Sequence, residues 1–487
     1  MSHPKITVTK KSLAESPKKF TKLILTEDSP QYHRFVETSD GNTEYRMGVG
    51  KFGDITARTL RTLIRGIVLA AKNHQVEFLA VELHNTQFPG LSHHSATWFY
   101  STLIENLHLA SYEFKTYKTK PQSKTALKEI LVCSIATAEA FAGTKRGEVV
   151  GTYTNAARDI ANTTGDDMTP KHLAAAAKKM ATGTKIAVKV LGLTEIKKRK
   201  MGLLEAVAKG SHHEPQFIVM EYWGAGKLNA EYGKEKSKNK KINEATQPLV
   251  LIGKGITYDT GGLNVKPTGA MHDMHMDMSG GSSVMAAITA AAILGVKRNI
   301  IALIPAAENA ISSTSMRAGD IATSMSGQTV EILHTDAEGR LVLADALTYA
   351  TRYNPRAIID VATLTGAALI ALGQQASAVM TKNPELESEL RRLGEESGDL
   401  VWPLPLWDEY KIGLKSARAD ISNIATNFSK FGGAIEGGIF LSHFAPKDVA
   451  WAHIDIAPRM DSIPSDKLAK GSTGEPVRLL IAFLEQY

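Results

Sequence analysis

The chain is 487 residues long, with 43% hydrophobic and 22% charged residues and a formal net charge of +7. These proportions are typical of a globular protein, and this length predicts two or three domains. No apolar run approaches the roughly 20 residues of a membrane span, and the first residues lack the apolar core of a secretory signal. The single cysteine, Cys133, excludes an intrachain disulfide framework and fits a reducing compartment, so we expect a cytoplasmic protein.

Short strands alternate with helices in the N-terminal third. Three apolar segments are predicted as strands, at 22–25, 76–81 and 129–134. Helical spacing of apolar residues over 58–72 predicts a helix, and a second helix is expected over 147–162. Thr169 followed by Pro170 predicts the start of the next helix. We place a domain boundary in the connecting helix, which separates residues 1–155 from residues 156–487.

The C-terminal part keeps this alternation. The unbroken apolar segment 248–252 is typical of a strand buried on both faces, and three further short apolar segments are predicted as strands, at 299–305, 330–333 and 357–361. Helices are predicted over 282–294 and 341–353. Strands that alternate with helices predict the α/β class, with a parallel or mixed sheet covered by helices on both faces. In such folds, binding sites form at the carboxyl ends of the strands.

Two glycine-rich stretches of charged residues begin where an apolar strand ends. The first is residues 253–262, GKGITYDTGG, and it continues to Lys266 and Asp277. The second is residues 334–340, HTDAEGR. Glycine-rich turns are places where the backbone passes close to a ligand, a metal or another chain. The position of both stretches at predicted strand ends makes them the candidate active site.

Four carboxylates in these stretches predict a metal site: Asp259, Asp277, Asp336 and Glu338. Converging carboxylates repel one another, and some must take up protons unless cations balance them. Two divalent ions balance four carboxylates, and a two-metal site can activate a shared water. Asp336 and Glu338 are two residues apart, so at a strand end they point the same way. Any one of these residues alone is better explained as a helix cap or a solvated loop residue, but together they favour the metal site.

The cationic residues of the two stretches suit different tasks. A lysine beside two dications is driven to lose its proton, and the neutral amine of Lys254 can then coordinate metal. Lys266 stays charged in this hypothesis and stabilises a developing oxyanion, and Arg340 opens a predicted helix, where an anion is also favoured. The sequence contains no His-Glu-x-x-His pair, no Gly-x-Ser-x-Gly elbow and no phosphate-binding Gly-x-x-x-x-Gly-Lys loop.

The charged stretches resemble signatures of the leucyl aminopeptidase (cytosol aminopeptidase) family of dinuclear-metal exopeptidases. The resemblance rests on residues 253–262, 274–278 (MHMDM) and 330–341 (VEILHTDAEGRL), and it continues to 451–457 (WAHIDIA). It covers about residues 155–487, whereas the N-terminal third shares only its general α/β character. It implies a macro-like N-terminal α/β domain, serving oligomer contacts or regulation, joined by a helix to a C-terminal α/β/α catalytic domain with a central mixed sheet.

The resemblance also implies a reaction and a role for each residue. The enzyme would release N-terminal residues, preferably leucine or other apolar residues, by attack of a metal-bridging water or hydroxide on the first peptide bond. Two divalent ions per subunit, Zn or Mn with Mg or Co as alternatives, would be held by Lys254, Asp259, Asp277, Asp336 and Glu338. Lys266 would bind the resulting gem-diolate, and Arg340 would hold a bicarbonate that acts as general base. The substrate-binding residues would be Met274, Thr363, Leu364, Gly366, Ala457 and Met460.

Other expectations concern a departure from the family's pattern and the partners of the protein. His334 stands where the family usually has asparagine, which predicts a changed preference for the first residue. The resemblance implies a homohexamer, built as a dimer of trimers, that acts on peptides with a free N-terminus. Basic runs at 197–200 and 234–241 are best explained as solvated loops, but they leave DNA binding open as a function of a different class. A further alternative is a dipeptidase, for instance one acting on cysteinylglycine.

Overall fold

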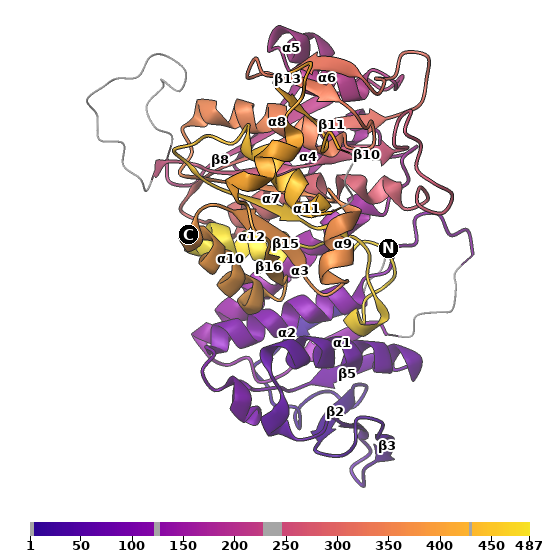
Figure 1. Cartoon of the computed structure of the whole chain (residues 1–487). Coiled ribbons are helices and arrows are strands. Elements are labelled where there is room, and N and C mark those ends of the chain that lie inside the picture. Colours follow the sequence, from indigo (N-terminus) through magenta and orange to yellow (C-terminus); the bar gives the residue numbers. More distant parts are fainter. Residues whose placement is uncertain (1–3, 121–126, 227–245, 428–430) are drawn as a thin grey trace. The chain divides into compact units, whose positions relative to one another are not determined.

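The computed structural model describes residues 4–120, 127–226, 246–427 and 431–487. The chain forms two compact units, one of Met1–Asn155 with Ser462–Lys470 and the other of Ala156–Asp461 with Gly471–Tyr487. Helix α3 (Ala138–Ala161) includes the point in the sequence where the first unit gives way to the second (Figure 1). No sequence pattern indicated that the short segment Ser462–Lys470 belongs with the N-terminal unit.

The smaller unit is built on a six-stranded sheet. In spatial order its strands are β1 (Lys5–Val8), β6 (Glu129–Val132), β5 (Phe78–Val81), β2 (Thr21–Thr26), β4 (Thr43–Gly48) and β3 (His33–Glu37). Among these described strands, only β3 runs antiparallel to its neighbour. Helix α1 (Ala57–Asn73) starts at Thr56, whose hydroxyl accepts a hydrogen bond from the Thr59 amide, and buries its apolar face with α2 (Ala96–Ser111). The strands and the helix predicted here are confirmed.

The larger unit is built on a nine-stranded mixed sheet. Its order is β16 (Val401–Pro403), β15 (Ser377–Thr381), β18 (Ala450–Asp455), β14 (Ala357–Ala362), β9 (Leu249–Gly253), β11 (Asn299–Asn309), β8 (Gln216–Trp223) and β7 (Ile186–Leu191), with β10 (Gly255–Asp259) beside β11. The central strands β18, β14, β9 and β11 are parallel. Strands β15 and β8 are antiparallel to β18 and β11, which makes the sheet mixed as expected.

Two groups of helices cover this sheet (Figure 1). Helices α6 (Gly202–Ala208), α8 (Gly339–Ala350) and α11 (Gly433–Ser442) share one apolar core with Val250 and Ile252 of β9. Leu249 and Leu251, which alternate with these two residues along the strand, are equally buried, and α7 (Ser279–Leu294) also packs on β9. Because neighbouring side chains on a strand alternate between faces, β9 is buried on both sides, which explains its unbroken apolar sequence. The predicted α/β/α arrangement is confirmed.

One helical segment is more apolar than the sequence analysis allowed. Met274–Leu294 meets the length and composition of a membrane span, but 83% of its apolar window is buried inside the protein. This burial is typical of a core helix, because the surface that a lipid would cover already packs against the sheet and against α12 (Val477–Gln486).

Three local features differ from the sequence predictions. Residues Gly255–Asp259 form strand β10 rather than a turn, because Gly255 and Ile256 pair with the far end of the long strand β11. The antiparallel pair β7–β8 was not predicted. Thr169 precedes α4 (Pro170–Ala181) as expected, but its hydroxyl contacts His172 Nδ1 and caps no backbone amide.

Candidate metal centre

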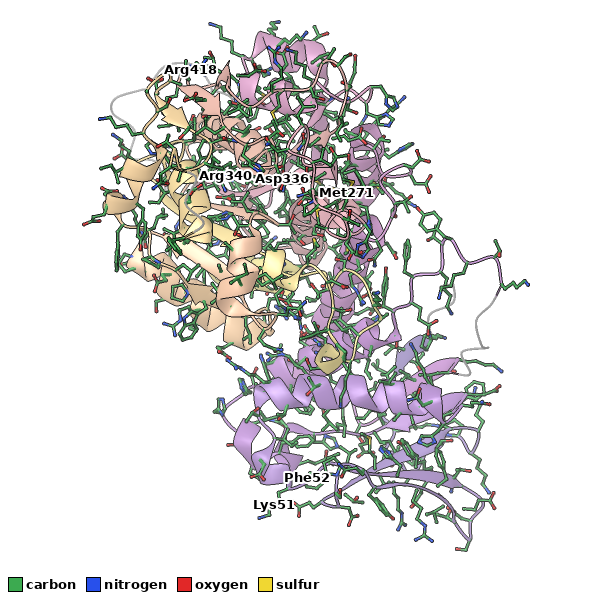
Figure 2. All side chains as sticks on the ribbon, turned by 45° about the vertical axis from the view of Figure 1, so that its right-hand side comes forward. Lys51, Phe52, Met271, Asp336, Arg340 and Arg418 are labelled. Atoms are coloured by element: carbon green, nitrogen blue, oxygen red, sulfur yellow. The ribbon has the colours of Figure 1, made fainter. Side chains whose placement is uncertain are left out.

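The four predicted carboxylates converge near Lys254, which directly follows the central strand β9. Asp259 is the last residue of β10, and Asp277 lies in the short helix η5 (Met274–Met278). Oxygen atoms of Asp259, Asp336 and Glu338 all lie within 4.8 Å of one another. Figure 2 labels Asp336 and Arg340 in the larger unit. This spacing allows the three carboxylates to bind one cation together.

A turn brings Asp336 and Glu338 together, and not the strand end that the sequence analysis assumed. Strand β13 (Thr329–Ile332) ends before both residues, and α8 begins at Gly339 directly after Glu338. A Cβ atom at position 339 would lie 2.5 Å from Lys254 Cε. Any larger residue here would displace the Lys254 side chain from the carboxylates, so glycine is favoured where α8 starts beside it.

Lys254 links Asp277 to the rest of the cluster. Its Nζ lies 2.8 Å and 2.7 Å from the two carboxylate oxygens of Asp277 and 2.9 Å from Glu338 Oε1, and it donates to the Thr363 carbonyl at 3.0 Å. Burial lowers the pKa of Lys254, but the carboxylates of Asp277 and Glu338 raise it, and the net shift is upward. In this arrangement Lys254 is a charged counter-ion of the carboxylates.

Lys266 is the second counter-ion. Its Nζ lies 2.8 Å from Asp259 Oδ2 and 2.6 Å from Asp336 Oδ1, and 14% of its side chain is exposed. Burial lowers the pKa of Lys266 and the neighbouring carboxylates raise it, with a net upward shift. Its partly exposed ammonium is therefore charged and reachable by a ligand at the rim of the cluster.

With all four carboxylates ionised, the two lysines leave an excess of two negative charges. Burial raises the pKa of Asp277 to about 8 and that of Asp336 to about 7, with repulsion from Asp259 as a further cause. The pKa of Glu338 is raised for the same reasons, and its Oε2 makes no hydrogen bond with any described residue. Buried, repelling carboxylates with an unpartnered oxygen fit divalent metal ions, which would balance the charge and satisfy that oxygen.

Two polar residues hold these carboxylates in place: Asn309, which the sequence analysis missed, and Thr363, which it assigned to substrate binding. Asn309 ends β11, and its amide nitrogen donates to Asp259 Oδ1 at 2.8 Å and to the Thr335 carbonyl at 3.1 Å. The hydroxyl of Thr363 donates to Asp277 Oδ1 at 2.7 Å. Such contacts orient metal ligands. Asn309 could have been found by the same signal as Asp259, because it is a polar residue at the end of a buried apolar strand.

Arg340 lies in the first turn of α8, as predicted. Its Nη1 donates to the Asn423 carbonyl at 2.7 Å and lies 3.4 Å from Glu436 Oε1. Burial lowers the pKa of Arg340. The Asn423 side chain also accepts from the Leu333 amide and donates to the His334 carbonyl, so it fixes the turn before Asp336. The sequence analysis identified neither Asn423 nor Glu436.

His334 contacts the backbone of the proposed ligand turn. Its Nδ1 accepts from the Asp336 amide at 3.3 Å. Burial lowers the pKa of His334, and the charges of Lys266 and Arg340 lower it further. The imidazole therefore favours its neutral form beside the cluster.

The predicted substrate-binding residues come from three segments of the larger unit. Thr363, Leu364 and Gly366 follow β14, and Ala457 and Met460 follow β18. Strands β14 and β18 are parallel neighbours, so their carboxyl ends and the following loops adjoin. Met274 begins η5, the short helix that contains Asp277. The large residues of this set are partly exposed, and Thr363 is buried.

The comparisons with known proteins agree with the sequence motifs. The profile of the "Cytosol aminopeptidase family, catalytic domain" matches residues 155–481, and that of the family's N-terminal domain matches residues 45–121. A "Probable cytosol aminopeptidase" of Azoarcus sp. (strain BH72) is 39% identical over 445 residues, covering 90% of this chain and 83% of that protein. Another, of Polaromonas naphthalenivorans (strain CJ2), is 44% identical over 374 residues, covering 77% of this chain and 68% of that protein.

A solved structure is similar over nearly the whole chain. The "Bottromycin maturation enzyme BotP in complex with Mn" aligns with a TM-score of 0.83 and 29% sequence identity, covering 96% of this chain and 99% of that one. The α/β/α fold, the carboxylate cluster and the match to the family's catalytic domain together define a metal-dependent hydrolase of the exopeptidase class. The chain belongs to the cytosol aminopeptidase family, and it is a metalloaminopeptidase of that family.

Proposed function

We propose that this protein is a leucyl aminopeptidase-type enzyme that releases N-terminal leucine and other apolar residues from peptides with a free N-terminus. The cluster of Asp259, Asp277, Asp336 and Glu338 with two lysines is the observation that supports this proposal most directly. The relatives named above support the aminopeptidase reaction.

The cluster is proposed to hold two divalent ions, Mn or Zn with Mg or Co as alternatives. Its net negative charge and the unpartnered Glu338 Oε2 support this, as does the Mn in the similar structure. When bound, such ions supply Lewis acidity and lower the pKa of a water nucleophile. The Lys254 amine can bind a metal only after it loses its proton. The carboxylates raise its pKa in the present structure. Bound metal ions would neutralise these carboxylates and lower the pKa of Lys254.

Lys266 and Arg340 are proposed to handle negative charge during the reaction. The Lys266 ammonium is held by Asp259 and Asp336 at the rim of the cluster, where it can stabilise negative charge on the substrate carbonyl oxygen. Both hydrogen bonds of Arg340 to described residues use Nη1, so Nη2 is available for an anion such as bicarbonate, which would accept a proton as general base.

The first side chain of the substrate is proposed to bind between the loops that follow β14 and β18. Of the predicted residues, Gly366 and Ala457 are small and Met274, Leu364 and Met460 are apolar, which favours leucine over charged residues. Residues 156–487 are proposed as the catalytic domain and residues 1–155 as a domain for oligomer contacts, supported by the separate family profiles. A homohexamer in the cytoplasm remains part of this proposal.

A metal-by-substrate screen tests the proposed function. The chelated protein would be incubated with Mn, Zn, Mg or Co and with leucyl, alanyl and glutamyl amides, and N-acetyl-leucinamide would serve as the matched blocked substrate. We expect metal-dependent release of leucine and no cleavage of the blocked amide, because the site must take up the free amine. Equal cleavage of blocked and free leucinamide, or no cleavage with any metal, would overturn the proposal.

The structure does not favour a nucleic-acid function. In the basic run 197–200, Lys197 lies 3.5 Å from Glu205, and Lys198 and Arg199 lie 3.9 Å and 3.4 Å from Glu195. These acidic partners reduce the positive potential that a phosphate backbone needs. The run 234–241 lies outside the described residues.

Comparing turnover of dipeptides with that of longer peptides separates a dipeptidase from a general aminopeptidase.

A further inference from the structure

The carboxylate of Asp455 joins two loops of the larger unit. Asp455 ends β18 and is fully buried. Its Oδ1 accepts hydrogen bonds from the Leu364 amide at 3.0 Å and from the Ala457 amide at 3.1 Å. Its Oδ2 accepts from the Thr365 hydroxyl at 2.6 Å. One buried side chain therefore ties the loop after β14 to the loop after β18.

These two loops contain most of the proposed pocket. Asp455 pairs with Ala362 in the parallel ladder between β18 and β14, so both loops leave the sheet side by side. Thr365 is the N-cap of α9 (Gly366–Leu372), and its hydroxyl oxygen accepts from the Ala368 amide while its hydrogen goes to Asp455. Asp455 thus fixes where α9 begins, which is at the pocket residue Gly366.

The same loop is anchored to the metal centre by another residue. The Thr363 carbonyl accepts from Lys254 Nζ at 3.0 Å, and the Thr363 hydroxyl donates to Asp277 Oδ1 at 2.7 Å. Thr363 therefore fixes the loop after β14 relative to the proposed metal ligands, and Asp455 fixes the same loop relative to the loop after β18. Among the described residues, Asp455 forms no hydrogen bond with a proposed metal ligand.

We propose that Asp455 is a positioning residue that sets the width of the pocket for the first substrate residue, and thereby its selectivity for size. This inference rests on the proposed aminopeptidase function. Removing the carboxylate leaves one buried and two partly buried donors without their acceptor, and the two walls must move for these donors to reach water or new partners. A pocket with loosened walls discriminates less well between a leucine and an alanine side chain.

Asp345 provides a matched control. It is also fully buried, lies on α8, and accepts from three backbone amides: Leu203 at 3.0 Å, Leu204 at 3.0 Å and Met325 at 2.7 Å. None of these donors belongs to the proposed pocket. Asp345→Ala therefore removes the same number of hydrogen bonds from the same unit, so it reports the effect of losing buried hydrogen bonds outside the pocket.

The first measurement is the ratio of kcat/KM for leucyl and alanyl amides. We expect Asp455→Ala to lower this ratio by at least about fivefold, mainly through KM of the leucyl substrate. Asp455→Asn should keep the ratio within about twofold, because its amide oxygen can still accept from Leu364 and Ala457. Asp345→Ala should also keep it within about twofold. Equal ratios in the wild type and Asp455→Ala, or an equal fall in Asp345→Ala, would overturn the positioning role.

The second measurement does not depend on activity. Amide hydrogen exchange of peptides covering residues 363–370 and 456–460 should be faster in Asp455→Ala and unchanged in Asp345→Ala. Unchanged exchange in Asp455→Ala overturns the tie whatever the substrate. If the wild type cleaves neither amide, the proposed function is refuted instead. The exchange result still shows whether Asp455 holds the two loops together. If Asp455→Ala does not fold, both measurements are made on Thr365→Val, which removes the bond to Oδ2 together with the N-cap bond from the Ala368 amide. Thr365→Ser keeps the hydroxyl and is the conservative control.

Discussion

Replacing Lys254 by methionine tests whether its ammonium stabilises the carboxylate cluster. The side chain is only 3% exposed, and its Nζ lies within 2.9 Å of both Asp277 and Glu338. Methionine fills a similar volume without the charge, so two buried carboxylates lose their shared cation. Removing one partner of a buried ion pair costs about 3–5 kcal/mol. For a unit of roughly 320 residues this lowers the melting temperature by about 4–7 °C.

The assay is calorimetric melting in the presence of a chelator, so that no metal replaces the missing cation. Lys189→Met, at an exposed position on β7, controls for the loss of a lysine. The double variant Lys254→Met/Asp277→Asn should recover part of the loss, because it removes one of the stranded charges. A Lys254→Met protein that melts at or above the wild-type temperature in chelator would refute the counter-ion role. In the same variant, added Mn should raise the melting temperature less than in the wild type, because one proposed ligand is lost.

Other predictions address the ligands, the pocket and a buried acid. Asp336→Asn and Glu338→Gln should each lower kcat on leucinamide by at least about 1000-fold, and wild-type rates in either variant would contradict the metal assignment. His334→Asn should change the ranking of aminoacyl amides, and an identical profile would remove this residue from selectivity. Burial raises the pKa of Asp345 to about 7, above the usual value for aspartate of about 3.9, so the folded state retains this proton. Protonated Asp345 therefore contributes its full stabilisation of the folded state below about pH 4, and this stabilisation is lost as the pH rises through about 7. Asp345→Asn should make urea-derived stabilities less dependent on pH between about pH 5 and pH 7, and equal slopes would contradict the assignment.

Sequence periodicity determined much of the fold, because each signal is local. The unbroken apolar run at 248–252 predicted a strand buried on both faces, and β9 lies in the centre of the sheet with helices on both sides. The segment 58–72 predicted α1 to within a residue at each end. The contiguous motifs around Asp259 and Asp336 likewise pointed to the candidate metal centre and to the family, because each motif contains its charged residues within a few consecutive positions.

Only the tertiary structure decided which distant residues support that centre. Asn309 meets Asp259 from 50 positions away, and Asp455 meets Leu364 from 91 positions away. Such contacts depend on strand order and register, which place the ends of β10 and β11, and those of β14 and β18, next to each other. Local hydrophobic patterns do not encode which strands become neighbours. The sequence therefore named the proposed ligands, whereas the pairing of strands determined how their carboxylates are held, where Lys254 lies between them, and which buried side chain joins the two loops of the proposed pocket.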